Sequence, residues 1–160
     1  MPAGWENFFI AEVGATAALT GLVIVAISIN LSRILAFPAL PGRAAEAIVV
    51  LAGALVLSSL MLIPQVQHNL GIEILIAAIA IWLVPVVVQT RTYRAARESG
   101  HGSIGARVLL AQINTLPFVI AGAFVTLGNE SGFYWLAAGV ILALIGGMLN
   151  TWVLLVEILR

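Results

Sequence analysis

Four amide side chains lie inside long apolar stretches of the sequence, where a polar group needs a partner. They are Asn30, Gln112, Asn114 and Asn150. Counting about 1.5 Å per residue from the middle of each stretch places the four within about 10 Å of one another in depth. We therefore expect one polar layer. It could consist of hydrogen bonds between helices, each worth about 0.6 kcal/mol on average, or it could line a pathway for a solute. The first interpretation is favoured because such bonds are common.

Carboxylates stand near the ends of the same stretches. They are Glu12, Glu46, Glu73 and Glu157. The simpler interpretation is that they sit at the membrane surface, with Arg43 and Arg160 close to Glu46 and Glu157. The functional interpretation is a stacked pair of acidic rings at the mouth of a pore, which would attract cations.

Glu12 is the carboxylate most strongly expected to have a function. Thr16 and Thr20 follow it at helical spacing, so the three side chains share one helix face. We expect this face to point into the bundle.

Enzymatic chemistry is poorly represented. The chain has no cysteine, which excludes disulfides, thiolate metal sites and a thiol nucleophile. His68 and His101 are expected on opposite membrane faces, about 30 Å apart, and His68 with Glu73 makes at best a weak metal pair. Ser99 and Ser103 flank His101 in a glycine-rich loop without an orienting carboxylate. The formal net charge is zero, so the chain lacks the excess of basic residues that is typical of nucleic-acid binding. We expect no catalytic residue, metal or cofactor.

Five apolar helices must position these residues. The chain is 62% hydrophobic and 9% charged, whereas soluble domains carry about 25% charged residues. The apolar runs predict an all-α integral membrane bundle, residues 1–160 forming one transmembrane domain. The spans are expected at about 8–35, 44–64, 71–91, 104–128 and 132–159. The third helix should continue past Thr90 through Arg91, Arg94 and Arg97, and Pro85 and Pro117 should kink spans three and four.

Small residues recur at heptad spacing in the first and last spans. They are Gly14, Ala18, Gly21 and Ser28 in the first, and Gly139, Ala143 and Gly146 in the last. Lipid gives helices no hydrophobic reason to associate, so they associate where their backbones can approach closely. We expect both stripes to contact protein, first of all within the bundle; the alternative is the same helix of a second subunit.

The arginines predict the orientation. All seven arginines fall on the same side of a five-span chain. Basic loops stay cytoplasmic, which predicts an external N-terminus and an internal C-terminus. No cleavable signal peptide is expected, because the first apolar run is too long.

The opening WENFFIAEVGATAALTGLVIVAISINLSRI, with LPGRAAEAIVVL and SSLMLIPQ after it, resembles a group of small prokaryotic multi-span proteins. Some of them are labelled modulators of FtsH protease. The resemblance covers roughly the first 65 residues. It implies a multi-pass protein of the prokaryotic inner membrane and, as a partner, another membrane protein.

Two functions remain open. The first is a non-enzymatic membrane protein that acts through helix–helix contacts, associating with itself or modulating other membrane proteins. The alternative is a homo-oligomeric ion channel or small-solute pathway lined by the amide and glutamate side chains. Both imply the lipid bilayer and a second copy of the chain as partners.

Overall fold

The computed structural model describes residues 4–37, 40–99 and 104–159, and the side chains of residues 4–37, 40–90 and 108–157. This part of the chain is almost entirely helical and contains no strand. The helices are α1 (Trp5–Ile29), α2 (Leu31–Ala36), α3 (Leu40–Leu60), α4 (Gln67–Ser99), α5 (Ile104–Thr126) and α6 (Ser131–Leu159). All except α2 are long and apolar enough to cross a membrane. The predicted all-α chain with five long apolar helices is confirmed.

The length of α4 agrees with the sequence. Its apolar part is Gln67–Thr90, and the same helix continues to Ser99. The prediction that the helix continues through the arginine-rich segment is therefore confirmed for its backbone.

The first helix ends earlier than expected. A continuous span to residue 35 was predicted, but α1 stops at Ile29 and the short α2 starts at Leu31. Asn30 separates them with φ −102° and ψ 12°. Its side-chain amide donates to the carbonyl of Ala26 at 2.9 Å. Asparagine competes for backbone partners in this way, which explains why the helix breaks there.

The second spanning helix begins earlier than expected. The segment up to Arg43 was predicted as a turn, but α3 starts at Leu40 and includes Pro41 and Gly42 in its first turn. Proline fits there because the first backbone N–H groups of a helix have no partner inside it, and its fixed φ suits a helix.

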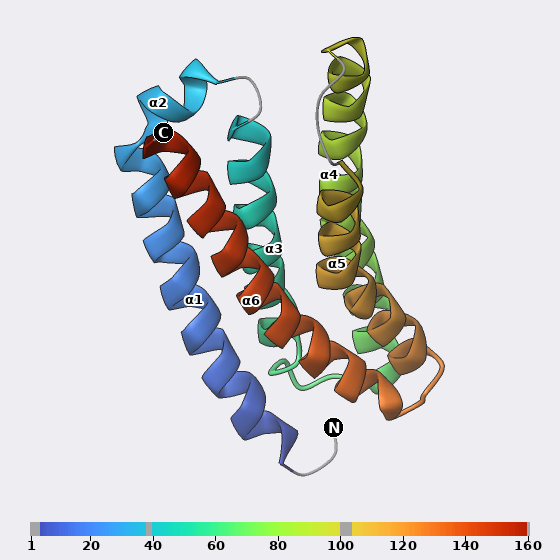
Figure 1. Ribbon diagram of the computed structural model, residues 1–160. Coiled ribbons are helices and arrows are strands. Elements are labelled where there is room, and N and C mark those ends of the chain that lie inside the picture. Colours follow the sequence, from blue (N-terminus) through green and yellow to red (C-terminus); the bar gives the residue numbers. More distant parts are fainter. Residues whose placement is uncertain (1–3, 38–39, 100–103, 160) are drawn as a thin grey trace.

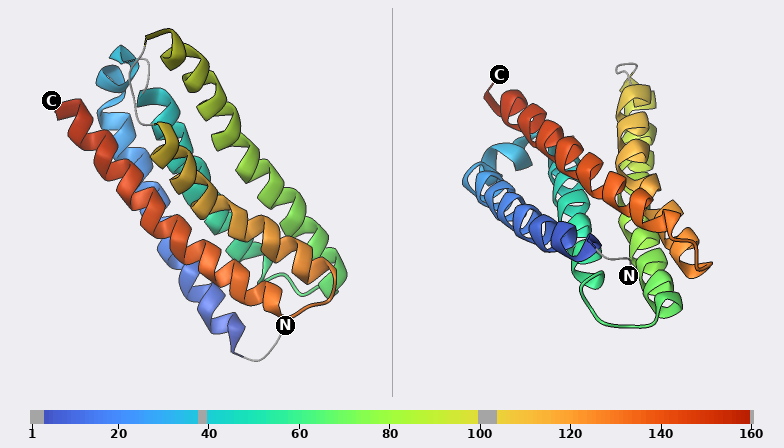
Figure 2. Two further views of the ribbon diagram at one scale, coloured as in Figure 1. Left: turned by 45° about the vertical axis from the view of Figure 1, so that its right-hand side comes forward. Right: turned by 90° about the horizontal axis from the view of Figure 1, so that it is seen from below.

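The helices form two groups that diverge toward one end (Figure 1). Helix α3 packs against α1, α4 and α6, while α4 and α5 run side by side (Figures 1 and 2). Helix α1 begins at the end of the bundle opposite to that at which α6 finishes; we call these the N-terminal and C-terminal ends. The helix segments that contain Arg33, Arg43, Arg91–Arg97 and Arg107 are at the C-terminal end. Arg160 is outside the described residues.

Glycines bring α4 and α5 together near the N-terminal end. A Cβ atom at Gly71 would overlap the backbone of Thr126, and one at Gly122 would lie 2.7 Å from the Cα atom of Leu75. Only glycine allows backbones to approach so closely. The two helices therefore form a tightly joined pair at this end. Pro85 and Pro117 lie within α4 and α5, and α5 changes direction along its course (Figure 1).

An apolar core with an aromatic cluster fills the N-terminal half. Phe9, Phe118 and Phe133 are completely or almost completely buried in it. The ring of Trp5 lies 6.0 Å from that of Phe9 and 4.9 Å from that of Tyr134, centroid to centroid. These contacts tie the start of α1 to the start of α6. A second apolar cluster joins the ends of α1 and α6 to α2 and the start of α3 at the C-terminal end; it includes Val23, Ile34, Leu51 and Leu154.

Candidate functional site

A cavity lies where α3, α4, α5 and α6 diverge. Its volume is about 240 Å³. Its walls are Arg43, Glu46 and Val50 of α3, Pro85 of α4, Leu110, Ala111 and Asn114 of α5, and Gly146, Leu149, Asn150 and Val153 of α6. It thus combines two charged side chains and two amides with an aliphatic wall.

Two of the predicted amides face this cavity. Asn114 packs directly against Gly146, where a Cβ atom would collide with its amide group. Asn150 follows Gly146 by one turn of α6. Within the described part of the chain, neither amide group has a hydrogen-bond partner. Both are half-buried, so the cavity is lined with amide groups whose bonding capacity is unused.

The charged residues of the cavity are already engaged. Arg43 donates to Glu157 at 2.8 Å, in an ion pair at the surface. From the sequence, Arg43 was expected near Glu46 and Arg160 near Glu157; the ion pair between Arg43 and Glu157, which joins α3 to α6, was not predicted. Glu46 is only 3% exposed and has an interaction of its own within the protein. It lies on the face of α3 that turns toward the other helices.

The other two amides bond elsewhere. Gln112 accepts a hydrogen bond from the indole N–H of Trp82 at 2.8 Å, which joins α5 to α4. Asn30 bonds to its own helix. The four amides are therefore not brought together in one layer. The sequence alone predicts that Gln112 and Asn114 point in different directions, since they are two positions apart and cannot share one helix face.

The cavity ends against the apolar core. One turn toward the N-terminal end from its lining, each helix contributes a buried apolar residue: Ala54, Ile81, Phe118 and Ala143. The core therefore bounds the cavity on its N-terminal side.

Glu12 is half-buried on the inward face of α1, as expected. Its atom Oε2 is buried and has no hydrogen-bond partner. The hydroxyl groups of Thr16 and Thr20 do not donate to this carboxylate. They donate instead to the backbone carbonyls of Glu12 and Thr16, at 2.5 and 2.6 Å. No sequence pattern pointed to Ser58 on α3, which is completely buried and whose Oγ also lacks a partner among the described residues.

Glu73 is exposed and far less constrained. Its carboxylate accepts a hydrogen bond from Gln65 at 2.9 Å.

The Nδ1 atom of His68 lies 3.1 Å from the backbone carbonyl of Thr126. Among the residues that the structure describes, no three histidine, cysteine or acidic side chains form a group that could hold a metal ion. His101 and Ser103 are outside the described residues.

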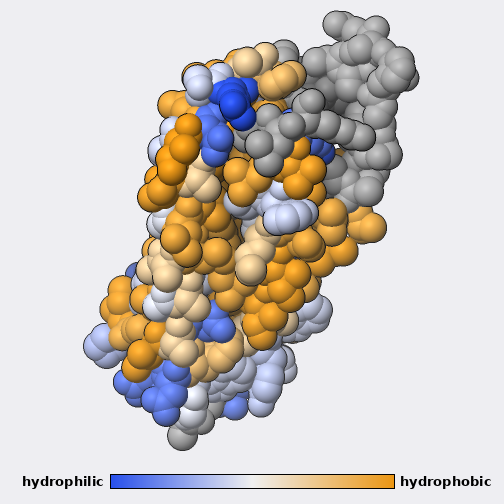
Figure 3. All heavy atoms as spheres, turned by 60° about the vertical axis from the view of Figure 1, so that its left-hand side comes forward, coloured by the Kyte–Doolittle hydropathy of each residue, from blue (hydrophilic) through white to orange (hydrophobic). Residues whose placement is uncertain are grey.

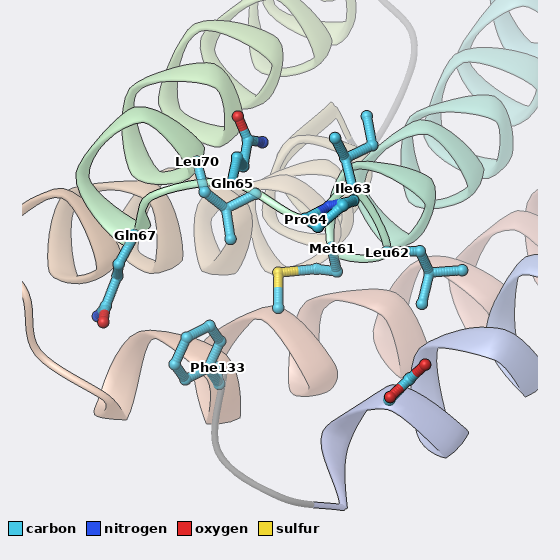
Figure 4. Close-up of a pocket in the computed structure, with 9 residues that line it drawn as sticks. Met61, Leu62, Ile63, Pro64, Gln65, Gln67, Leu70 and Phe133 are labelled. Atoms are coloured by element: carbon cyan, nitrogen blue, oxygen red, sulfur yellow. The ribbon is translucent and has the colours of Figure 1, made fainter.

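A second cavity lies at the N-terminal end, with a volume of about 230 Å³. It is enclosed by the α3–α4 connection and the first turns of α1 and α6 (Figure 4). Met61, Leu70 and Phe133 form an apolar floor, and Gln67 and Glu6 supply its polar groups. The Nε2 atom of Gln67 is buried and has no partner.

The two small-residue stripes have opposite surroundings. Gly139 and Ala143 of α6 are buried, and Gly146 touches Asn114. In α1, by contrast, Gly14, Ala18, Gly21 and Ser28 are all exposed. The expectation that both stripes pack within the bundle is wrong for α1. Its buried face carries larger residues, Phe9, Thr16, Thr20, Val23 and Ile27, and the stripe points away from it.

Comparison with family models, with curated proteins and with solved structures finds no match.

Proposed function

We propose that this chain is a non-enzymatic membrane protein that acts through helix–helix contacts, and that the outward stripe of α1 makes them. The stripe consists of Gly14, Ala18, Gly21 and Ser28. The observation that supports it is a contrast between glycines. Among the described atoms, nothing lies within 4 Å of the position that a Cβ would take at Gly14 or Gly21.

Glycines elsewhere in the spanning helices are in close contact. Seven of them have neighbouring atoms within 3 Å of the Cβ position: Gly53, Gly71, Gly122, Gly132, Gly139, Gly146 and Gly147. Glycine inside a helix costs roughly 0.5–1 kcal/mol relative to alanine. In the other helices, close packing offsets this cost. In α1, no described atom contacts Gly14 or Gly21 in this way.

A second copy of the chain is the partner we propose. The stripe contains two small residues four positions apart, Gly14 and Ala18, which is the spacing that lets membrane helices cross closely. The side of the molecule on which α1 lies is predominantly hydrophobic between two hydrophilic ends (Figure 3). Two such faces are self-complementary, so a two-fold contact would bury both stripes at once. The resemblance of the first 65 residues to modulators of FtsH protease supports a different membrane protein as a further partner.

Cross-linking in liposomes tests this proposal. Since the chain has no cysteine, Ala18→Cys introduces a single thiol at the centre of the stripe. We expect a covalent dimer to form, and the added substitutions Gly14→Leu and Gly21→Leu to weaken association about tenfold, or 1.4 kcal/mol. The matched control is Ala80→Cys on the exposed face of α4. Equal cross-linking at both positions would contradict the proposal.

The orientation is also a proposal. We infer that the C-terminal end of the bundle faces the cytoplasm of a prokaryotic cell and the N-terminal end faces outward. The supporting observation is that the helix segments containing six arginines gather at the C-terminal end. Reporter fusions at the two termini test it: opposite compartments are expected, and the same compartment for both would contradict it.

A solute pathway is the second candidate, because the cavity of α3–α6 brings Asn114, Asn150 and Glu46 together. The apolar core closes the cavity on one side, so a continuous path would require an oligomer. Ion flux into reconstituted liposomes that is lost on Asn114→Leu would favour this candidate over the first.

A further inference from the structure

We propose that the cavity of α3–α6 is a binding site for an uncharged lipid with a small hydrogen-bonding headgroup. The proposal is independent of the contacts made by α1. It follows from the shape of the cavity, from the groups that line it and from their depth in the apolar spans.

The cavity opens onto the surface that faces lipid. Its rim is formed by Leu110 of α5 and by Leu149 and Val153 of α6, which are 53%, 54% and 40% exposed. The α4–α5 pair and the α3–α6 pair diverge on either side of it (Figure 1). A molecule could therefore enter sideways from the membrane, with its tail along the aliphatic rim.

The groups inside the cavity call for a neutral hydrogen-bonding partner. Asn114 and Asn150 each offer an N–H₂ donor and a carbonyl acceptor that no described group uses. Arg43 is paired with Glu157, and Glu46 is engaged within the protein. No spare charge within the described lining is therefore available for a charged headgroup. Gln89 is a third amide in this region without a hydrogen-bond partner for its Nε2 among the described residues. It lies one turn from Pro85 on α4 and is only 5% exposed.

The depth of the amides also points to a neutral lipid. Asn114 lies seven residues from Arg107, and Asn150 lies seven residues from Glu157; these are the nearest charged residues toward the C-terminal end of the bundle on each helix. At about 1.5 Å per residue, each amide lies about 10 Å from that charged residue along the helix axis, inside an apolar stretch. A charged phosphate is costly at that depth, whereas a hydroxyl or carbonyl group is tolerated when it is hydrogen-bonded.

The size of the cavity is consistent with this occupant. Its volume of about 240 Å³ corresponds to about eight water molecules at ~30 Å³ each, which is enough for a small headgroup but not for a whole lipid. An acyl chain alone would fill the space and leave the amides unbonded in hydrocarbon. A hydroxyl- or carbonyl-bearing headgroup satisfies the amides while its tail follows the rim.

Photolabelling of the full chain in nanodiscs tests the proposal. The probe is a diacylglycerol that carries a diazirine next to the ester carbonyl, and the comparison is a phosphatidylcholine with the same diazirine. We expect the diacylglycerol to label peptides of α5 and α6 more strongly. The double variant Asn114→Leu/Asn150→Leu should lower this labelling about twentyfold, since each hydrogen bond contributes roughly a factor of five. Equal labelling by both probes, or labelling unchanged in the double variant, would overturn the proposal.

Two further variants serve as controls. Asn30→Ala removes an amide near the same end of the bundle that bonds to its own helix, and it should leave labelling unchanged. Leu149→Trp fills the rim and leaves both amides intact, so it should lower labelling even if the double variant fails to fold. Labelling that survives Leu149→Trp would also overturn the proposal. Substituting Gly14 and Gly21 by leucine should not affect labelling, which separates this test from that of α1.

A thiol-accessibility measurement excludes an aqueous cavity. The single cysteine of Asn150→Cys should react with a membrane-impermeant thiol reagent at least roughly tenfold more slowly than that of Ser32→Cys, because the reactive thiolate forms in water. Ser32 is exposed at the C-terminal end. Equal rates would mean that water fills the cavity, and the proposed lipid site would be wrong.

Discussion

Helices α1 and α6 carry small residues at the same spacing, yet the two stripes have different surroundings. In α6 the stripe is filled by neighbours: the ring of Phe118 comes within 2.7 Å of the Cβ position at Gly139, and Asn114 packs on Gly146. In α1 the stripe faces away from the bundle, and no described atom comes close to its glycines. Small residues therefore indicate where a helix can be approached closely. Which partner approaches depends on the larger side chains around it.

The largest expected effect is at the buried stripe. Gly139→Leu must displace the ring of Phe118, which is completely buried. Overpacking of this kind costs typically 1–3 kcal/mol, and we expect about 3 kcal/mol because a whole ring must move. Thermal unfolding in detergent measures it. A change below about 0.5 kcal/mol would mean that α5 and α6 do not pack as described.

A smaller effect is expected at Gly146→Ala. The added methyl group meets the amide of Asn114, which is a flexible side chain beside a cavity and can turn aside. We therefore expect a loss of about 1 kcal/mol, near the lower limit for overpacking. The double variant Gly146→Ala/Asn114→Ala is the control. It should recover most of the loss, because it removes the group that clashes.

A substitution in the outward stripe should raise the stability of the subunit instead of lowering it. Gly21→Ala adds a methyl group where no described atom is within 4 Å. It should stabilise the isolated subunit by up to about 1 kcal/mol, since alanine is the better helix former. Unfolding must be measured at a dilution at which the chain is monomeric. If the subunit is destabilised instead, a neighbour within the subunit contacts Gly21 and the comparison fails.

The smallest effect is expected at Ser28→Ala. The hydroxyl of Ser28 donates to the carbonyl of Ile24 at 2.7 Å, within its own helix. That carbonyl already accepts a backbone hydrogen bond within the helix. Losing the bond from Ser28 should therefore change stability by less than about 0.5 kcal/mol. A larger loss of association in the cross-linking assay would show that Ser28 contacts the second copy.

Local sequence patterns were sufficient to predict the helices. Apolar runs of about 20 residues predicted the five long helices, and the absence of proline and glycine between Thr90 and Gly100 predicted the continuation of α4. Two local features were missed. Asn30 bonds to its own helix and ends α1, and Pro41 starts a helix instead of ending one.

The candidate site was less predictable because it depends on how helices are rotated and how far apart they stand. The depth of Asn114 and Asn150 could be counted along the chain, but not the fact that both face one cavity. Gln112 lies at a similar depth and instead bonds to Trp82. The burial of Glu46 follows from the rotation of α3, and neither charge nor spacing in the sequence encodes it.

The close contacts at Gly71 and Gly122 have a mechanical consequence. They clamp α4 to α5 near one end, backbone against backbone, while the cavity of α3–α6 lies toward the other end of the same pair. If the cavity widened, the clamped helices would move away from α3 and α6 as one unit and would pivot at the N-terminal end, where the apolar core packs the helices together. A small rotation there becomes a larger displacement at the mouth.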